Sequence, residues 1–121
     1  AGCMRLFRRK KKPNISSYTE RWKALQKNCA SRKTWPQAII EADDLLCEAL
    51  KCRGYKGKTT GEKLVAAQRD LSANDAVWVG HKLRKHLEQG DIDVRKLKKT
   101  DVVNALAGFR QALRDLGALE K

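Results

Sequence analysis

The chain has 121 residues, enough for one compact domain with its own core but too few for two such domains. Hydrophobic residues make up 41% of the sequence, which predicts a folded chain rather than a disordered one. The 27 Lys and Arg outnumber the 14 Asp and Glu to give a formal charge of +13, and no apolar run approaches the ~20 residues that span a bilayer.

The positive charge is spread over the whole chain. Basic residues at positions 5 and 8–12 account for +6 of it, and +7 remains for residues 13–121. Such a charge favours a polyanionic partner, nucleic acid first and an anionic membrane surface second. The alternative is that the charge serves only to keep the protein soluble.

Residues 1–13 form a basic segment that ends at Pro13. We expect a flexible amino-terminal arm there, followed by a single helical domain over residues 14–121. Met4 is expected to be the native start, preceded by three added residues. The arm is suited to contact phosphates or an anionic surface, and the simpler alternative is that it is only solvated.

Helix starts are predicted at three capping boxes, in which a Ser or Thr stands before the first turn and an acidic or amide residue follows three positions later. These boxes begin at Ser17, Thr34 and Thr59. Ser72 and Thr100 are weaker start signals of the same kind. Helix ends are predicted at glycines that can adopt the left-handed conformation, namely Gly54, Gly90 and Gly117.

Between these signals the apolar residues recur at helical spacing, and no stretch alternates as a strand does. We therefore expect an all-α protein, an up-and-down antiparallel bundle of four long helices and one short helix. Trp22 and Trp35 lie in the apolar stripes of their helices and are expected in the core, whereas Trp78 lies beside the apolar stripe of its helix. The stripes comprise, in chain order, Tyr18, Trp22, Leu25 and Cys29; Trp35, Ile39, Ile40, Leu46 and Leu50; Leu64, Val65 and Leu71; Ala76, Gly80, Leu83 and Leu87; and Val102, Leu106, Phe109, Leu113 and Leu116.

The four cysteines show neither a CxxC pair nor a His spacing suited to zinc, so we expect no metal and no cofactor. Cys29 and Cys47 fall within predicted helical segments and are expected to be reduced thiols. This usage is typical of a cytoplasmic protein, and we expect that compartment.

The stretch RGYKGKTTGEK, residues 53–63, contains the Gly-Lys-Thr of a phosphate-binding loop. A Walker loop requires a glycine at position 52, which is Cys52, and a preceding strand where a helix is predicted. The stretch is better explained as a helix end, a basic turn and a newly capped helix. Lys56 and Lys58 in that turn are suited to contact a phosphate backbone.

Asp43 occupies a core-facing position between Ile39 and Leu46, where an aliphatic residue is expected. A buried carboxylate is costly unless it is paired, and the natural partners are Arg84 and His81. Two interpretations stay open. Asp43 orients a catalytic or RNA-contacting arginine, or it belongs to a structural ion pair.

Four stretches carry a resemblance to a known family: WPQAIIEADDLLCEAL, RGYKGKTTGEKL, VWVGHKLRKHLEQGD and FRQALRDLGAL. Over residues 17–119 the chain resembles small bacterial helical proteins of the HEPN superfamily. The resemblance implies a bundle of four or five up-and-down helices, a homodimer, and metal-independent RNA cleavage. In that cleavage the 2′-hydroxyl attacks the adjacent phosphate, a histidine moves the proton, and an arginine offsets the developing charge.

The HEPN motif is an arginine, a polar residue directly after it, and a histidine separated from the arginine by four to six residues. Arg84 matches the arginine, and Lys85 stands where similar sequences commonly carry Asn. The expected histidine positions are Gln89, Gly90 and Asp91, so the motif is degenerate.

Two histidines flank Arg84 at other spacings. At about 100° per helical residue, His86 points away from Arg84, whereas His81 shares its face. His81 is therefore the histidine that is placed to assist Arg84 in proton transfer.

These observations favour a non-catalytic HEPN-like module that binds RNA or another nucleic acid through a basic surface. One alternative is a protein-interaction or antitoxin-like scaffold module whose basic surface meets an acidic protein. Another is a weak metal-independent endoribonuclease that uses Arg84 and His81. The expected nucleic-acid contacts are His81, Lys82, Arg84, Lys85, Lys56 and Lys58, with Arg95, Lys96, Lys98 and Lys99 as an extension of the patch.

Overall fold

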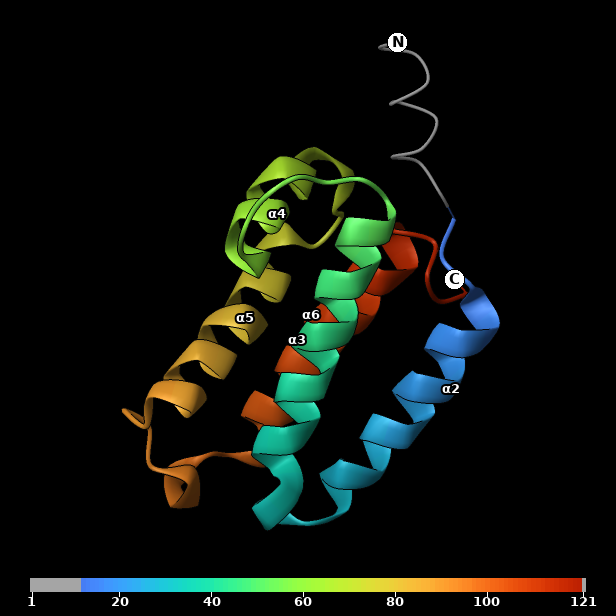
Figure 1. Ribbon diagram of the computed structural model, residues 1–121. Coiled ribbons are helices and arrows are strands. Elements are labelled where there is room, and N and C mark those ends of the chain that lie inside the picture. Colours follow the sequence, from blue (N-terminus) through green and yellow to red (C-terminus); the bar gives the residue numbers. More distant parts are fainter. Residues whose placement is uncertain (1–11, 121) are drawn as a thin grey trace, which may run out of the picture.

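The structure is a computed structural model that describes residues 12–120, and its regular secondary structure within that range is entirely helical (Figure 1). The predicted all-α class is therefore confirmed for these residues. Short 3₁₀ segments precede or extend some of the helices. The α-helices are α2 (Ile15–Gln26), α3 (Trp35–Cys52), α4 (Thr60–Ala67), α5 (Asn74–Gln89) and α6 (Lys99–Asp115).

α3 and α6 lie at the centre of the molecule, and the other helices pack around them (Figure 1). Followed along the chain, α2, α3, α5 and α6 run in alternating directions, as short connections require. The closest pairing is between α5 and α6, whereas α2 packs on α3. The short α4 packs on α3 and lies beside the end at which α5 begins.

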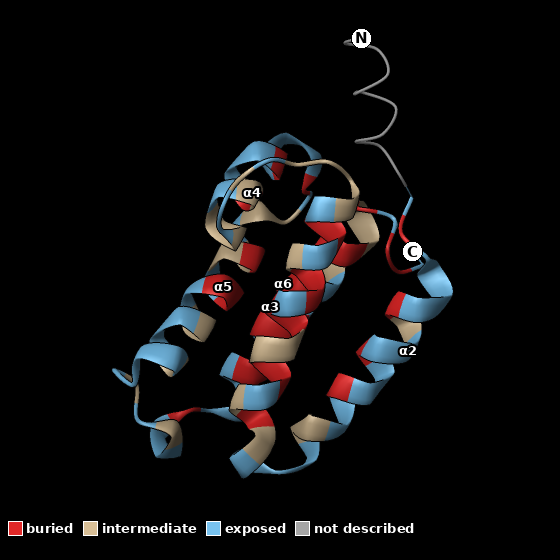
Figure 2. Ribbon diagram, viewed as in Figure 1, coloured by how far each residue is buried: buried red, intermediate tan, exposed pale blue. Residues whose placement is uncertain are grey.

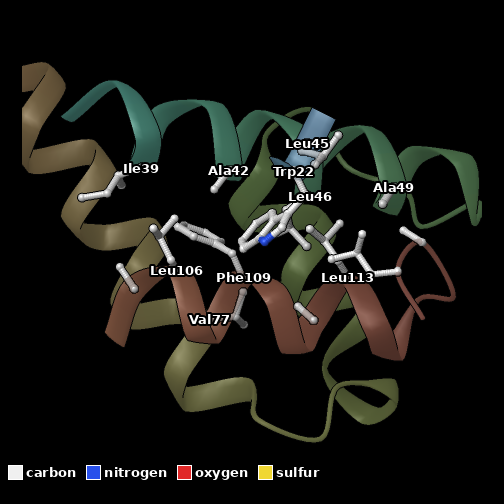
Figure 3. Close-up of a cluster of buried hydrophobic side chains, with 14 of the residues drawn as sticks. Trp22, Ile39, Ala42, Leu45, Leu46, Ala49, Val77, Leu106, Phe109 and Leu113 are labelled. Carbon is white, nitrogen blue, oxygen red and sulfur yellow. The ribbon is translucent and has the colours of Figure 1, made fainter. Parts of the chain in front are cut away.

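Buried hydrophobic side chains from all five helices meet in one core (Figures 2 and 3). Every residue of the predicted stripe from Val102 to Leu116 is buried, and Phe109 at its centre is 0% exposed. Trp22 and Trp35 are buried as predicted. Complete burial of a large apolar side chain contributes about 1.5–3 kcal/mol, so the facing stripes of α3 and α6 supply much of the stability of the fold.

Two glycines bring the backbones of α5 and α6 close together. A Cβ atom at Gly80 would lie 2.9 Å from the ring of Phe109, and a Cβ atom at Gly108 would lie 2.6 Å from the carbonyl oxygen of Ala76. Real Cβ atoms do not make contacts this short, so both positions require glycine at this helix spacing.

The buried face of α5 differs from the predicted stripe. Gly80 is buried as predicted, but Leu83 and Leu87 are only half-buried, and Val77 and His81 take the inward positions. The glycine contact to Phe109 sets the rotation of α5, and that rotation turns His81 toward α3.

Helix starts agree with the sequence at one capping box and depart from it at another. The Thr59 hydroxyl accepts a hydrogen bond from the Glu62 amide at 3.1 Å, as predicted. The predicted start at Ser17 is wrong, because α2 begins two residues earlier and Asn14 Oδ1 accepts from the Ser17 amide at 3.2 Å. Asn14 is thus the cap, and Ser17 lies within the first turn.

At two further predicted starts the helix begins in the expected place without the expected cap. The Thr34 hydroxyl donates to the carbonyl oxygen of Asn28 at 2.6 Å instead of capping α3. Ser72 donates from its backbone amide to Asp115 at 2.9 Å, which ties the start of α5 to the end of α6. The predicted helix ends are confirmed, since Gly54, Gly90 and Gly117 all have positive φ.

Residues 1–11 of the predicted arm and Lys121 lie outside the described residues. Pro13, the last residue of that arm, is buried, and Asn14 directly after it caps α2. Within residues 12–120, the structure contains no helix long and apolar enough to cross a membrane.

Candidate functional site

An open pocket of about 560 Å³ lies where α3, α4 and α5 come together. α3 contributes its middle turns, α4 contributes its first turn and the preceding cap, and α5 contributes the face that the glycine contact turns toward α3. The lining residues are Asp43, Asp44, Cys47, Thr59, Thr60, Gly61, Glu62, Val65, Trp78, His81, Arg84, Lys85 and Glu88.

Asp43 contacts both of the partners that its sequence position predicts. Its Oδ2 lies 2.9 Å from His81 Nδ1 and accepts a hydrogen bond from Arg84 Nη1 at 3.2 Å. The Asp43 side chain is 1% exposed, and the side chains of His81 and Arg84 are 10% and 17% exposed. A carboxylate in this position avoids a large desolvation cost because two potentially cationic groups face one of its oxygens.

Every nitrogen of the Arg84 guanidinium is bonded to a carboxylate. Nη1 donates to Asp44 at 2.6 Å as well as to Asp43, and Nε and Nη2 donate to Glu88 at 3.0 and 3.4 Å. Glu88 stands four residues after Arg84 on the same helical face. Arg84 is therefore held by three carboxylates, and the second N–H of Nη2 is the donor left without a carboxylate acceptor among the described residues.

The charges explain the titration behaviour of this cluster. Burial opposes the charged form of Arg84, but hydrogen bonds to Glu88 and Asp44 and the negative charge of Asp43 outweigh it and raise the pKa of Arg84. The same hydrogen bond from Arg84 lowers the pKa of Glu88. The Arg84–Glu88 pair thus favours the charged form of both of its members.

His81 is oriented by Asp43 and faces the first turn of α4. An ionised carboxylate can only accept, so Nδ1 is the donor of this contact, and in the neutral form of the ring Nε2 keeps a lone pair. A Cβ atom at Gly61 would lie 3.6 Å from Nε2 and 3.7 Å from the ring of Trp78. The Trp78 and His81 rings meet edge to face, with centroids 5.8 Å apart.

Cys47 is a pocket residue that the sequence did not single out. The Lys63 ammonium lies 3.8 Å from its sulfur. Cys47 follows Asp43 by four residues, so helical spacing was the signal that could have placed it in the pocket. Asp44, Thr59 and Gly61 come from separate parts of the chain, and only the packing of α4 on α3 brings them to the same site.

The structure separates the predicted nucleic-acid contacts into two groups. His81 and Arg84 are committed to Asp43 inside the pocket. The predicted lysines are exposed, and none of them makes an ion pair with a described residue; they are Lys56 and Lys58 in the turn before α4, and Lys82 and Lys85 on α5.

The predicted extension of the patch lies in the connection between α5 and α6. Arg95, Lys96, Lys98 and Lys99 are all exposed there, and Lys99 is already the first residue of α6. Arg95 is bonded to Asp93. His86 is exposed and lies 3.1 Å from Asp91, away from the pocket, as its helical position predicts.

The turn between α3 and α4 has the form expected from sequence. α3 runs to Cys52, and Gly54 closes it before the capped start of α4. A helix rather than a strand precedes the turn, so this segment lacks the strand that a Walker loop requires. Cys29 and Cys47 are free thiols. Over the described part of the chain, no group of three or more His, Cys, Asp or Glu could hold a metal ion.

Comparisons with known proteins place the chain in no family. No protein-family model and no solved structure matches it. Over 67 residues, 52% of the chain, it is 39% identical to a protein named enolase from Mycoplasmopsis synoviae (strain 53). The match covers 15% of the length of that protein.

Proposed function

We propose that this protein is a non-catalytic, HEPN-like helical module that binds nucleic acid, preferably RNA, through its exposed lysines. Lysines that are free of acidic partners can neutralise phosphates and release counterions, which drives binding with little sequence preference. The alternating directions of the four longer helices and the position of Arg84 on α5 support the HEPN-like architecture. The homodimer that the resemblance implies is part of the same proposal.

The observation that carries this proposal is that no lysine of residues 12–120 makes an ion pair. Residues 12–120 hold 21 of the 27 Lys and Arg and all 14 Asp and Glu, a formal charge of +7 (21 minus 14). Three arginines, Arg21, Arg84 and Arg95, make ion pairs with carboxylates, whereas no lysine of residues 12–120 does so. The uncompensated charge therefore resides on the lysines and on the five arginines of this range without an ion pair, which are Arg32, Arg53, Arg69, Arg110 and Arg114. The exposed lysines are the larger group that is available to a polyanion.

Lys82 and Lys85 are the strongest candidate contacts, because they stand three residues apart on the exposed side of α5. Lys58 directly precedes Thr59, which together with Lys85 lines the pocket. Phosphates on both sides of the pocket would be met by lysines of the connection between α3 and α4 and of helix α5. Arg84 and His81 are assigned to the structural network beneath them instead.

We propose that the protein is non-catalytic because the HEPN motif is incomplete. Most of the N–H donors of Arg84 already go to carboxylates, and Gln89, Gly90 and Asp91 supply no histidine at the family spacing. His86 is bonded to Asp91. The oriented His81 is the feature that favours the second candidate, a weak metal-independent endoribonuclease.

The test is a titration of the full chain with labelled single-stranded RNA at several salt concentrations, in which fluorescence anisotropy reports binding and a denaturing gel reports cleavage. The test variant is Lys82→Gln with Lys85→Gln. The matched control is Lys23→Gln with Lys27→Gln, which removes the same charge from two exposed, unpaired lysines at α2. Each lost phosphate contact should lower the slope of log affinity against log salt by about 0.7 on a single strand.

We expect salt-dependent binding without cleavage, a slope smaller by about 1.4 in the α5 variant, and a much smaller change in the control. Equal effects of the two variants would show that the surface of α5 is not the contact. Chelator-resistant cleavage that leaves a 2′,3′-cyclic phosphate and is lost in Arg84→Ala would establish the endoribonuclease instead. Absence of binding at low salt would overturn the proposal and leave the protein-interaction alternative.

A further inference from the structure

We infer that the pocket between α3, α4 and α5 binds a compact organic cation, an alkylammonium or guanidinium group. This inference is independent of nucleic-acid binding, because it concerns the acidic interior of the pocket rather than the lysines around it. A volume of about 560 Å³ lies within the range of small-molecule sites, which is roughly 300–1,000 Å³.

The charge of the lining favours a cation. Arg84 is already neutralised by its three carboxylates, and Lys85 is the other cation of the lining. Formally the lining carries two positive charges against four negative ones, so it is acidic although the protein is strongly basic. The acidic residues are Asp43, Asp44, Glu62 and Glu88.

The hydrogen-bonding groups in the pocket are predominantly acceptors. His81 is 8% exposed, and its Nε2 has no hydrogen-bond partner among the described residues. Oδ1 of Asp43 also has no such partner, but it is fully buried, so it adds negative charge beneath the pocket rather than a direct contact to a ligand. Glu62 makes no ion pair, and its carboxylate stands at the start of α4. An ammonium, with three donors and no acceptor, complements this set.

Trp78 supplies an aromatic surface for the same ligand. It is half-buried, lines the pocket and contacts His81 edge to face. Gly61 stands opposite, and a Cβ atom there would come within 3.7 Å of the Trp78 ring, so the absence of a side chain keeps the space beside the indole open. A cation over an indole face gains electrostatic attraction from the ring quadrupole.

Other ligand classes fit this pocket less well. A phosphate or carboxylate would meet uncompensated negative charge, and Arg84 beside it already gives most of its donors to Glu88, Asp43 and Asp44. A divalent metal ion lacks a suitable ligand set, since no group of three or more His, Cys, Asp or Glu gathers for it within residues 12–120. A donor-rich organic cation satisfies both the charge and the unused acceptors.

The experiment titrates the full chain with n-butylammonium, followed by NMR through the His81 ring and the Trp78 indole N–H. The neutral isostere 1-butanol and inorganic phosphate are the ligand controls. Glu62→Gln removes one pocket charge and leaves in place the Glu62 backbone amide that donates to the Thr59 hydroxyl. Glu20→Gln removes an equal charge from an exposed position on α2, which contributes nothing to the lining.

We expect saturable shifts of both residues with n-butylammonium, weak and non-saturating shifts with 1-butanol, and about fivefold weaker n-butylammonium binding in Glu62→Gln. Trp78→Leu should weaken binding by a similar factor when it is read at His81. Equal responses to the amine and the alcohol, saturable binding of phosphate at this site, or equal effects of Glu62→Gln and Glu20→Gln would overturn the inference.

A second experiment identifies the source of the cation. Gln replaces the basic residues that precede the described range, Arg5, Arg8, Arg9, Lys10 and Lys11. Tighter n-butylammonium binding in this variant would show that the chain itself competes for the pocket, and unchanged binding would point to a free amine or to a partner. RNA is absent from both experiments, so a failure of cation binding is distinguishable from a failure of nucleic-acid binding.

Discussion

Asp43 Oδ2 and His81 Nδ1 lie 2.9 Å apart, although 38 residues separate the two in the chain. The contact places a buried carboxylate of α3 against a buried imidazole of α5, and Arg84 joins it from the next turn. It links the core to the pocket, because the same His81 ring turns its other nitrogen toward Gly61. The stability of the fold and the shape of the site therefore depend on one carboxylate.

Replacement of Asp43 by Asn should destabilise the protein by about 3–5 kcal/mol, because the largely buried Arg84 would lose a charge that compensates its burial. Chemical denaturation measures the loss. Asp44→Asn is the matched control, since the Asp44 side chain is 55% exposed while bonded to the same Arg84. Its cost should stay below about 1 kcal/mol. Similar costs for the two variants would show that burial of Asp43 is not the decisive factor.

The close approach of α5 and α6 predicts that Gly108→Ala costs about 1–3 kcal/mol, because its new Cβ atom would overlap the backbone of Ala76. Gly61→Ala is the contrasting change. The space beside Gly61 leaves ordinary contact distances of 3.6 Å or more, and alanine favours the helix by up to about 1 kcal/mol. In thermal unfolding, the melting temperature of Gly108→Ala should lie well below that of the native chain, and the melting temperature of Gly61→Ala should lie close to it.

The start of α2 can be located by mutation. Asn14→Ala should cost about 1 kcal/mol, because Asn14 accepts the hydrogen bond that caps the helix. Ser17→Ala should be nearly neutral, since Ser17 is an exposed residue inside the first turn and supplies only its backbone amide. A larger loss of stability in Ser17→Ala than in Asn14→Ala, measured by urea denaturation, would show that Ser17 caps the helix, as the sequence suggests.

Tyr55 predicts a loss of stability at alkaline pH. Burial, together with the hydrogen bond to Asp70, raises the pKa of Tyr55 to about 12 from the ordinary value of 10.0. The folded state thus keeps its proton where the unfolded state loses it. The stabilising contribution is complete below pH 10 and disappears as the pH rises toward 12. Tyr55→Phe should unfold with a weaker pH dependence in that window, measured by denaturation at successive pH values.

Local signals in the sequence were sufficient for several features. The all-α class, the buried stripe of α6, the left-handed glycines and the Thr59 cap each depend on neighbours within about four residues, and all are present in the structure. Asp43 was also recognisable, because a carboxylate at an apolar helical position requires a partner, and helical spacing placed His81 and Arg84 on a common flank.

Other features were decided by tertiary packing alone. The rotation of α5 depends on Gly80 fitting against Phe109 of α6, so the inward position of His81 could not follow from the apolar period of α5 itself. Packing also drew Ser72 to Asp115, 43 residues further along the chain.

The acidic pocket shows the same division most clearly. Sequence alone determined that the chain is basic and that Arg84 shares a helical face with His81 and Glu88. Sequence also predicted Asp43 as their partner, but only the tertiary structure brought Asp44 of α3 and Glu62 of α4 to the same pocket. The physical reason is that charge is a property of composition, whereas the local field depends on distances between residues that are remote in the chain.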